Sequence, residues 1–332
     1  MPPTLIQDQQ PLSAVGLLFL FIIVLLVVLQ YVMVRYAGLL FRQIRRYWLR
    51  FRRYLGQHGV FIALKNNHPT SYHFLSQRFD IRHFYGLPLT LLFVVMAYIV
   101  SLFIGLVEDV MTLQPIVAMD YFVSAQMRQL HDSSLIKFFI VMTSFASTAM
   151  TILVMLVTAA LCWVFRQRYV FLGLLIAAVG STAFTFLSKS IYRRARPIDI
   201  LLVERTYSFP SGHATITVAL YGFIAYLLIR FSQHFRQRVR IFVVAVFFAI
   251  LIGFSRILLN EHYLSDVLGG YLVGGLWLTV AISVTEWLTA IGKITWRIES
   301  DISHSYVLWL SAVGILISTL TYAQLYQFPL LS

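Results

Sequence analysis

The stretch that decides the fold is IFVVAVFFAILIGFSRILLNEHYLSDVLGGYLVGGLWLTVAISVTEWL, residues 241–288. Two long apolar runs flank a short polar turn in this stretch. Across the turn lies the pattern Ser255-Arg256-x5-His262-x3-Asp266. Runs of about 20 apolar residues are long enough to cross a bilayer as helices. The stretch therefore predicts two transmembrane helices joined by a tight turn at one membrane face.

Similar apolar runs occur along the whole chain. Hydrophobic residues make up 59% of the sequence and charged residues only 12%, whereas soluble domains carry roughly 25% charged residues. Spanning segments should be helical, because backbone groups in lipid must pair within their own segment. We expect about eight spans, near residues 13–35, 87–107, 136–164, 169–188, 213–231, 240–258, 264–288 and 305–326. The predicted fold class is therefore all-α, a polytopic transmembrane helical bundle.

The basic residues that give the net charge of +13 cluster in alternate loops between the predicted spans. The basic loops lie between the first two spans (Arg42, Arg45, Arg46, Arg50, Arg52, Arg53, Lys65, Arg78, Arg82) and after the third (Arg166, Arg168), fifth (Arg236, Arg238, Arg240) and seventh (Lys293, Arg297). Alternate basic loops are typical of cytoplasmic loops under the positive-inside rule. The charge therefore requires no nucleic-acid partner, and both termini are expected on the opposite, outer side.

Two further strings lie in the loop that joins the fourth and fifth spans. They are Lys189-x6-Arg196-Pro197 and Pro210-Ser211-Gly212-His213. Two spans separate this loop from the turn after Arg256, so both connections open on the same side of the membrane. That side is the non-basic one, and the sequence predicts a single site there.

The residue types in these strings suit phosphoryl transfer. Such a reaction needs cations and amide donors for the non-bridging oxygens, a nucleophile, and a proton for the leaving oxygen. Lys189, Arg196 and Arg256 can supply the cations, and arginine can bind phosphate through two parallel hydrogen bonds. Ser211 and Gly212 open the fifth span, where free amides form an anion site and glycine permits close backbone approach.

His262 and Asp266 have the spacing i, i+4, which on a helix places them on one face. Asp266 could then accept a hydrogen bond from one ring nitrogen of His262 and leave the other as a nucleophile. An ion pair at the start of a helix would explain the same spacing. His213 remains as the candidate proton donor.

In this order and spacing the three strings resemble the signature of the type-2 phosphatidic acid phosphatase (PAP2) family of integral-membrane lipid phosphatases. The resemblance implies a six-helix core at residues 86–290. It would lie between an N-terminal transmembrane helix with a basic cytoplasmic loop (1–85) and a C-terminal transmembrane helix (291–332). Pro197, Pro210 and Ser255 fill supporting positions of the signature.

The resemblance also implies a mechanism and a range of substrates. His262 would attack phosphorus to form a phosphohistidine, His213 would protonate the leaving group, and no metal or other cofactor would be required. The expected activity is hydrolysis of a phosphomonoester or diphosphate headgroup. The candidate substrates are a polyprenyl diphosphate such as undecaprenyl diphosphate, phosphatidate, phosphatidylglycerol phosphate and a lipid A phosphate. A lipid phosphotransferase with the same site, and a non-catalytic lipid transporter or scaffold, are the alternatives.

We expect an integral membrane protein of a bacterial inner membrane, with its site on the non-basic side, facing the periplasm. The expected partners are the lipid phosphate substrate and the bilayer, and the sequence leaves the oligomeric state and the headgroup open.

Other segments allow two interpretations each. Arg42–Tyr54 (RQIRRYWLRFRRY) suits either the binding of anionic headgroups or a topology anchor. Apolar residues at near-helical spacing in 116–131 predict an interfacial helix that either shapes lipid entry or only connects two spans. Arg193, Arg194 and Arg205 are expected to recruit headgroups or to be plain surface charge.

Overall fold

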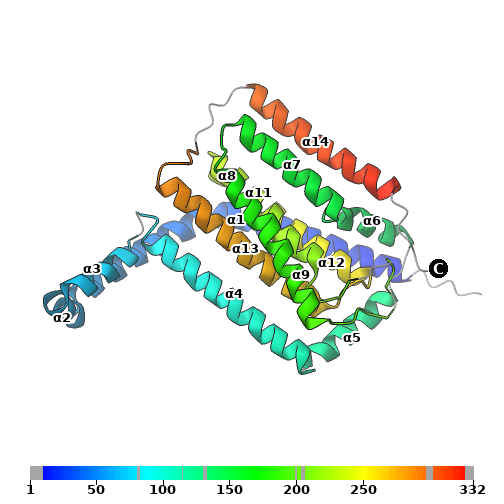
Figure 1. The fold of residues 1–332 in the computed structure, drawn as a ribbon, viewed down its shortest axis with the longest axis horizontal. Coiled ribbons are helices and arrows are strands. Elements are labelled where there is room, and N and C mark those ends of the chain that lie inside the picture. Colours follow the sequence, from blue (N-terminus) through cyan, green and yellow to red (C-terminus); the bar gives the residue numbers. More distant parts are fainter. Residues whose placement is uncertain are drawn as a thin grey trace, which may run out of the picture.

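The computed structural model describes residues 10–80, 83–113, 115–129, 133–198, 200–202, 206–296 and 302–325. In these segments every long regular element is a helix, and the long helices run side by side as a bundle (Figure 1). Seven helices of the described residues are long and apolar enough to cross a membrane, or eight if one bent pair counts as a single span. The predicted all-α transmembrane bundle is confirmed.

The spanning elements follow the predicted order. Most of their first and last residues differ from the predicted bounds by several positions. They are α1 (Gln10–Gln57), α4 (Leu87–Met111), α6 (Ser133–Ser144) with α7 (Thr148–Val164), α8 (Val170–Leu175) with α9 (Ser181–Tyr192), α10 (Gly212–Ile216) with α11 (Gly222–Phe231), α12 (Phe235–Leu258), α13 (Leu264–Ala290) and α14 (Ile302–Leu325). Short π-helical turns, Ile176–Gly180 and Thr217–Tyr221, join α8 to α9 and α10 to α11.

The third predicted span is broken into two helices. α6 and α7 meet at an angle of 43°. Ser147 caps α7, because its side chain accepts a hydrogen bond from the backbone N–H of Met150 at 3.4 Å. At the break, the carbonyl of Phe145 accepts a hydrogen bond from the hydroxyl of Tyr221 at 2.5 Å. Serine and tyrosine side chains therefore supply hydrogen bonds where the helix is interrupted.

α13 lies at the centre of the bundle and approaches α10 very closely. A Cβ atom on Gly270 would lie 2.6 Å from the carbonyl oxygen of Ser211, and one on Gly274 would lie 2.5 Å from that of Thr215. Small residues permit such backbone contacts between membrane helices. This packing brings the second predicted string, on α10, against the helix that follows the third.

The N-terminal part differs from the predicted span followed by a loop. α1 is one helix of 48 residues that continues through Arg42–Tyr54. At 1.5 Å per residue it is about 70 Å long, more than twice the hydrocarbon thickness of a bilayer. The basic segment contains no proline or glycine that would end the helix before Gly56. It therefore extends α1 and does not form a loop.

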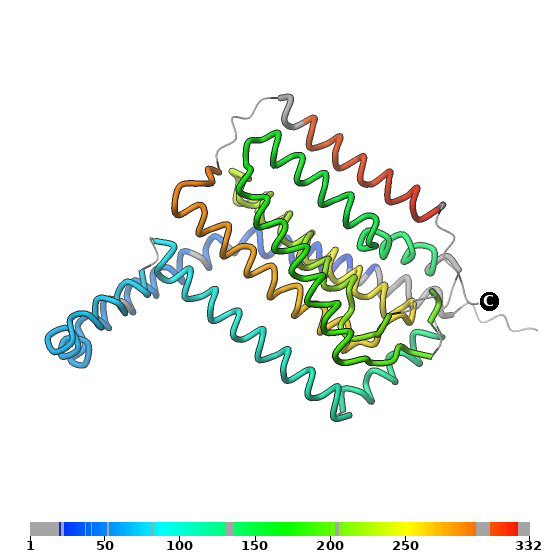
Figure 2. The backbone as a smooth tube through the Cα atoms, viewed as in Figure 1, coloured from blue at the N-terminus to red at the C-terminus, as the bar shows by residue number. Residues whose placement is uncertain are grey.

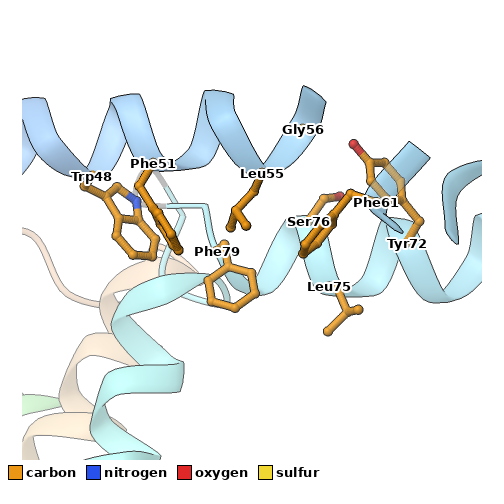
Figure 3. A pocket seen from close by; sticks show the side chains of 9 residues that line it. All are labelled: Trp48, Phe51, Leu55, Gly56, Phe61, Tyr72, Leu75, Ser76 and Phe79. Atoms are coloured by element: carbon orange, nitrogen blue, oxygen red, sulfur yellow. The ribbon is translucent and has the colours of Figure 1, made fainter. Parts of the chain in front are cut away.

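Two short helices, α2 (Gly59–Asn67) and α3 (Pro69–Arg78), fold back on the end of α1. Together they form an arm that projects from the bundle near the start of α4 (Figures 1 and 2). A cavity of about 110 Å³ lies within this arm, and aromatic rings supply much of its lining, including Trp48, Phe51 and Phe79 (Figure 3). The histidines His58, His68 and His73 are exposed on the arm.

The two ends of the bundle differ in character. One end holds the α9–α10 connection, the α12–α13 turn and α5 (Pro115–Arg128) (Figure 1). The described basic residues after α7, α11 and α13, among them Arg168, Arg236 and Lys293, lie at the opposite end. The predicted separation of the basic loops from the three strings is thus present in the described part of the chain.

Candidate active site

The α9–α10 connection and the α12–α13 turn are held together by backbone hydrogen bonds. The N–H of Ser211 donates to the carbonyl of Asp266 at 2.9 Å, and that of Leu201 donates to the carbonyl of Leu259 at 3.3 Å. These bonds join segments that are more than fifty residues apart in sequence. The structure therefore brings the three predicted strings together at one end of the bundle.

His262 is almost fully buried, and Ser208, Asp266 and Arg196 lie around its ring, with the hydroxyl of Ser208 3.4 Å from Nδ1. Its Nδ1 atom is 3.5 Å from Oδ2 of Asp266, and its Nε2 atom is 3.5 Å from Nη1 of Arg196. The expectation that His262 and Asp266 share one helical face was wrong, because His262 lies in the turn and α13 begins only at Leu264. The i, i+4 pair nevertheless forms, since the extended backbone of Tyr263 turns the imidazole back toward α13.

Asp266 fixes the start of α13. Its Oδ2 atom accepts a hydrogen bond from the backbone N–H of Tyr263 at 2.8 Å and another from the hydroxyl of Ser208. The first of these bonds belongs to a capping box, in which a residue of the first turn satisfies a free amide of its own helix. Asp266 therefore has both roles that its spacing from His262 suggested: it caps the start of the helix, and it faces the imidazole of His262.

Arg194 clamps this carboxylate from the other side, a role that the sequence did not reveal. Its Nη1 atom lies 2.6 Å from Oδ1 of Asp266, and its Nη2 atom lies 2.7 Å from Oδ2 of Asp120. Burial disfavours its charged form, but the two carboxylates outweigh that effect and raise the pKa of Arg194. The expectation of a headgroup-recruiting or plain surface charge was wrong, because only 13% of this side chain is exposed. Arg205 lies outside the described residues.

α5 supports the α12–α13 turn with its polar face. The predicted helix is present, and it exposes Met119 and Phe122 while it buries Asp120 and Ser124. Asp120 accepts a hydrogen bond from the N–H of Ser265 at 2.9 Å, and Ser124 donates one to Oδ1 of Asn260 at 2.7 Å. The apolar spacing indicated the helix, but the polar positions between decide which face is buried. The end of the predicted segment, residues 130–131, lies outside the described residues.

The three predicted cations lie around His262. Lys189 lies in the last turn of α9 and donates a hydrogen bond to the carbonyl of Tyr207. Arg196 donates to the carbonyl of Thr206 and to that of Glu261, both at 2.7 Å. Arg256, which is 1% exposed, donates to the hydroxyl of Thr143 at 3.0 Å.

These surroundings hold His262 in its neutral form. Burial is the main cause that lowers the pKa of His262 well below its usual value, and the positive charges of Arg196, Lys189 and Arg256 lower it further. A neutral imidazole keeps a lone pair on one nitrogen, so the ring can act as a nucleophile or base. The same cations can neutralise a bound anion.

The second string contributes the start of α10. Ser211 is its N-cap residue and is fully buried, but the hydroxyl makes no hydrogen bond to the described residues. A Cβ atom added to Gly212 would meet only Cγ2 of Thr185, at 3.9 Å. His213 follows Gly212 in the first turn of α10. A buried hydroxyl, a helix start and an unhindered glycine are features of an anion site.

The three supporting residues have packing roles. Pro197 and Pro210 are buried. Ser255 is fully buried, and its hydroxyl donates to the carbonyl of Ile252, one turn earlier in α12, at 2.6 Å. None of the contacts described for these residues reaches His262.

Glu261 is a second charged residue that sequence reasoning missed. Its side chain is fully buried, and Oε1 accepts a hydrogen bond from the N–H of Leu202 at 2.6 Å. Its Oε2 atom lies 3.5 Å from Nη1 of Arg196 and 3.8 Å from Nη2 of Arg256. A carboxylate thus stands between two of the predicted phosphate-binding guanidinium groups, directly before His262 in the chain.

Part of the chain resembles known proteins. Residues 168–290 match the model of the PAP2 superfamily. A segment of 91 residues is 37% identical to phosphatidylglycerophosphatase B of Bacillus subtilis (strain 168), and it covers 26% of this chain and 43% of that relative. The chain therefore spans less than half the length of that curated relative.

The fold also has a solved counterpart. It resembles the crystal structure of a transmembrane PAP2-type phosphatidylglycerolphosphate phosphatase from Bacillus subtilis, with a TM-score of 0.53 and 24% sequence identity. The match covers 58% of this chain and 96% of that structure. The family match contains all three strings and the turn that holds His262. The segment at residues 168–290 is therefore similar to the PAP2 superfamily.

Proposed function

We propose that the protein is a membrane lipid phosphatase that hydrolyses a phosphate ester headgroup. The observation that carries this proposal is the placement of His262, with Nδ1 beside Asp266 and Nε2 beside Arg196. An oriented imidazole next to cations is the arrangement that phosphoryl transfer requires. The relative and the solved structure, both named as phosphatases of phosphatidylglycerol phosphate, support a lipid substrate.

In the first step, Nε2 of His262 attacks phosphorus while the bond to the leaving oxygen breaks. Lys189, Arg196 and Arg256 neutralise the non-bridging oxygens, and the hydroxyl of Ser211 and the amide of Gly212 donate hydrogen bonds to them. His213 gives its proton to the leaving alkoxide. The products are a phosphohistidine at residue 262 and the dephosphorylated lipid.

In the second step, water attacks the phosphohistidine and gives up a proton to His213. The P–N bond breaks, inorganic phosphate leaves, and both imidazoles return to their starting states. Asp266 stabilises the positive charge that develops on the ring of His262, because its carboxylate lies at Nδ1. The three cations supply the charge neutralisation, so no metal ion enters either step.

The same intermediate would also serve a phosphotransferase. A second lipid hydroxyl would then replace water as the acceptor. The two reactions share every residue up to the phosphohistidine, and only their products differ.

The catalytic unit that we propose is residues 86–290. Every site residue described above lies between Asp120 and Asp266. The N-terminal segment (1–85) and the last helix (291–332) flank this unit, since α1 packs on α12 and α14 on α6 and α7. We propose a bacterial inner membrane with the site on the periplasmic face, because the opposite end carries the basic segments typical of the cytoplasmic side.

A phosphate-release assay tests the proposal. The purified full chain is incubated with phosphatidylglycerol phosphate, phosphatidate, a lipid A phosphate and undecaprenyl diphosphate, each with and without a chelator. The wild type should release phosphate from at least one lipid in both conditions, and His262→Gln should release none while it keeps the wild-type elution profile in detergent. A phosphorylated second lipid in place of free phosphate would identify a phosphotransferase. Full activity of His262→Gln would reject both the phosphatase and the phosphotransferase mechanism.

A further inference from the structure

Both the backbone and the side chain of Glu261 form hydrogen bonds to other residues of the site. Its backbone N–H donates to the carbonyl of Arg256 at 3.0 Å, and its carbonyl accepts from Nη1 of Arg196 at 2.7 Å. Its Oε1 atom accepts the amide of Leu202 at 2.6 Å. Main chain and side chain thus connect Glu261 to both Arg196 and Arg256, and the hydrogen bond from Leu202 holds the carboxylate in place.

The second oxygen of this carboxylate lies between two guanidinium groups. Oε2 is 3.5 Å from Arg196 and 3.8 Å from Arg256. Cations at these distances stabilise the charged form of a carboxylate. Since Glu261 is 0% exposed, little water screens its charge from the same cations. The carboxylate therefore removes part of the positive potential that a phosphate headgroup would meet.

The effect of this charge depends on the headgroup. A phosphomonoester carries a charge of about −1.5 to −2 at neutral pH. A diphosphate carries a further ionised phosphate group, so a fixed negative charge in the site disfavours it more strongly. Among the four side chains Lys189, Arg196, Arg256 and Glu261, the negative charge of Glu261 lowers the net charge from three to two.

We propose that Glu261 is a specificity-determining residue that makes the site prefer phosphomonoester lipids to diphosphate lipids. This inference rests on the phosphatase function proposed above and names the substrate class of that site. The residue acts through Arg196 and Arg256 and is a positioning residue for both.

Glu261→Gln removes the negative charge and nearly preserves the size of the side chain. The glutamine amide oxygen can still accept the hydrogen bond from Leu202, but the negative charge is gone. The ratio of kcat/KM for undecaprenyl diphosphate to kcat/KM for phosphatidylglycerol phosphate should rise at least tenfold. Inhibition by pyrophosphate should likewise become at least tenfold stronger relative to inhibition by orthophosphate, and this second ratio does not depend on turnover of a lipid.

Two further variants separate charge from structure. Glu261→Asp keeps the charge and should keep the wild-type ratios even if its activity falls. Glu286→Gln makes the same chemical change in α13, where Glu286 pairs with Arg230 at 3.1 Å, and should leave both ratios unchanged.

The outcomes distinguish this inference from the function on which it rests. If the wild type is active and both ratios in Glu261→Gln stay within threefold of wild type, the role assigned to Glu261 is wrong and the phosphatase stands. If the wild type releases phosphate from no lipid, the proposed function itself fails. If Glu261→Gln does not fold, a shift of more than threefold in either ratio in Glu261→Asp, which keeps the charge, overturns the role assigned to the charge.

Discussion

Nη1 of Arg194 lies 2.6 Å from Oδ1 of Asp266, across a sequence separation of 72 residues. The same guanidinium group bonds to Asp120 of α5 at 2.7 Å. Three separate segments therefore meet at one cation, just behind the carboxylate that faces His262. The orientation of the candidate nucleophile thus depends on a residue that does not touch it.

Arg194→Leu should destabilise the protein and reduce its activity. The substitution leaves Asp120 and Asp266 buried without their cation, and breaking a buried ion pair in this way costs about 3–5 kcal/mol. Thermal unfolding in detergent should show a clearly lower midpoint, and phosphate release should fall at least tenfold. The matched control is Arg193→Gln, since the neighbouring Arg193 is exposed. Equal unfolding midpoints and equal phosphate release in the two variants would mean that the ion pairs of Arg194 with Asp120 and Asp266 have no role.

The protein should lose stability in mild acid through His262. Because the pKa of His262 is lowered in the folded state, the unfolded chain binds a proton below about pH 6.5 while the folded chain does not. This contribution to the free energy of unfolding is fully present above that pH and is lost as the pH falls toward the folded pKa. His262→Gln should therefore show a smaller difference in denaturant midpoint between pH 7.5 and pH 5 than the wild type.

A direct titration checks the same point. In a histidine-labelled NMR sample, the resonance that disappears in His262→Gln should titrate well below pH 6.5. Titration at or above that pH would show that the imidazole is not held neutral by its surroundings.

Two glycines near the site should respond in opposite ways to alanine. In Gly212→Ala the new methyl group would meet only Thr185, at 3.9 Å, so the fold should be unaffected while a bound phosphate meets the methyl. In Gly270→Ala it would lie 2.6 Å from the carbonyl oxygen of Ser211, and such overpacking costs about 1–3 kcal/mol.

The measurements are unfolding midpoint and KM for each variant. Gly212→Ala should raise KM severalfold with an unchanged midpoint, and Gly270→Ala should lower the midpoint. Unchanged KM in Gly212→Ala would remove the start of α10 from the phosphate site.

Much of the fold could be predicted from the sequence, because the lipid environment makes the length and polarity of each segment decisive. Apolar runs such as 213–231 and 264–288 correspond to spans in the structure within a few residues. The interruption at Ser147 was not predictable in this way, since it depends on a capping side chain and on Tyr221 from another helix. The continuation of α1 through Arg42–Tyr54 was missed because a basic charge pattern indicates a membrane face and says little about backbone conformation.

The site was predictable only where motif spacing carried the information. Lys189, Arg196, Arg256 and His262 do come together, and the convergence follows from the order of the spans. Asp120, Arg194 and Glu261 act through contacts between distant segments, which motif spacing does not reveal. An aspartate within an otherwise apolar helical pattern, as at Asp120, was the one available signal.

The covalent step at His262 can be tested most directly by rapid quenching. Wild-type protein is mixed with a lipid substrate labelled with ³²P in the headgroup and quenched in alkali within the first turnover. The mechanism predicts label that is stable in base and labile in acid, on the peptide that contains His262, with none on His262→Gln. Full-rate phosphate release with no labelled protein at any time point, or label on another residue, would contradict it.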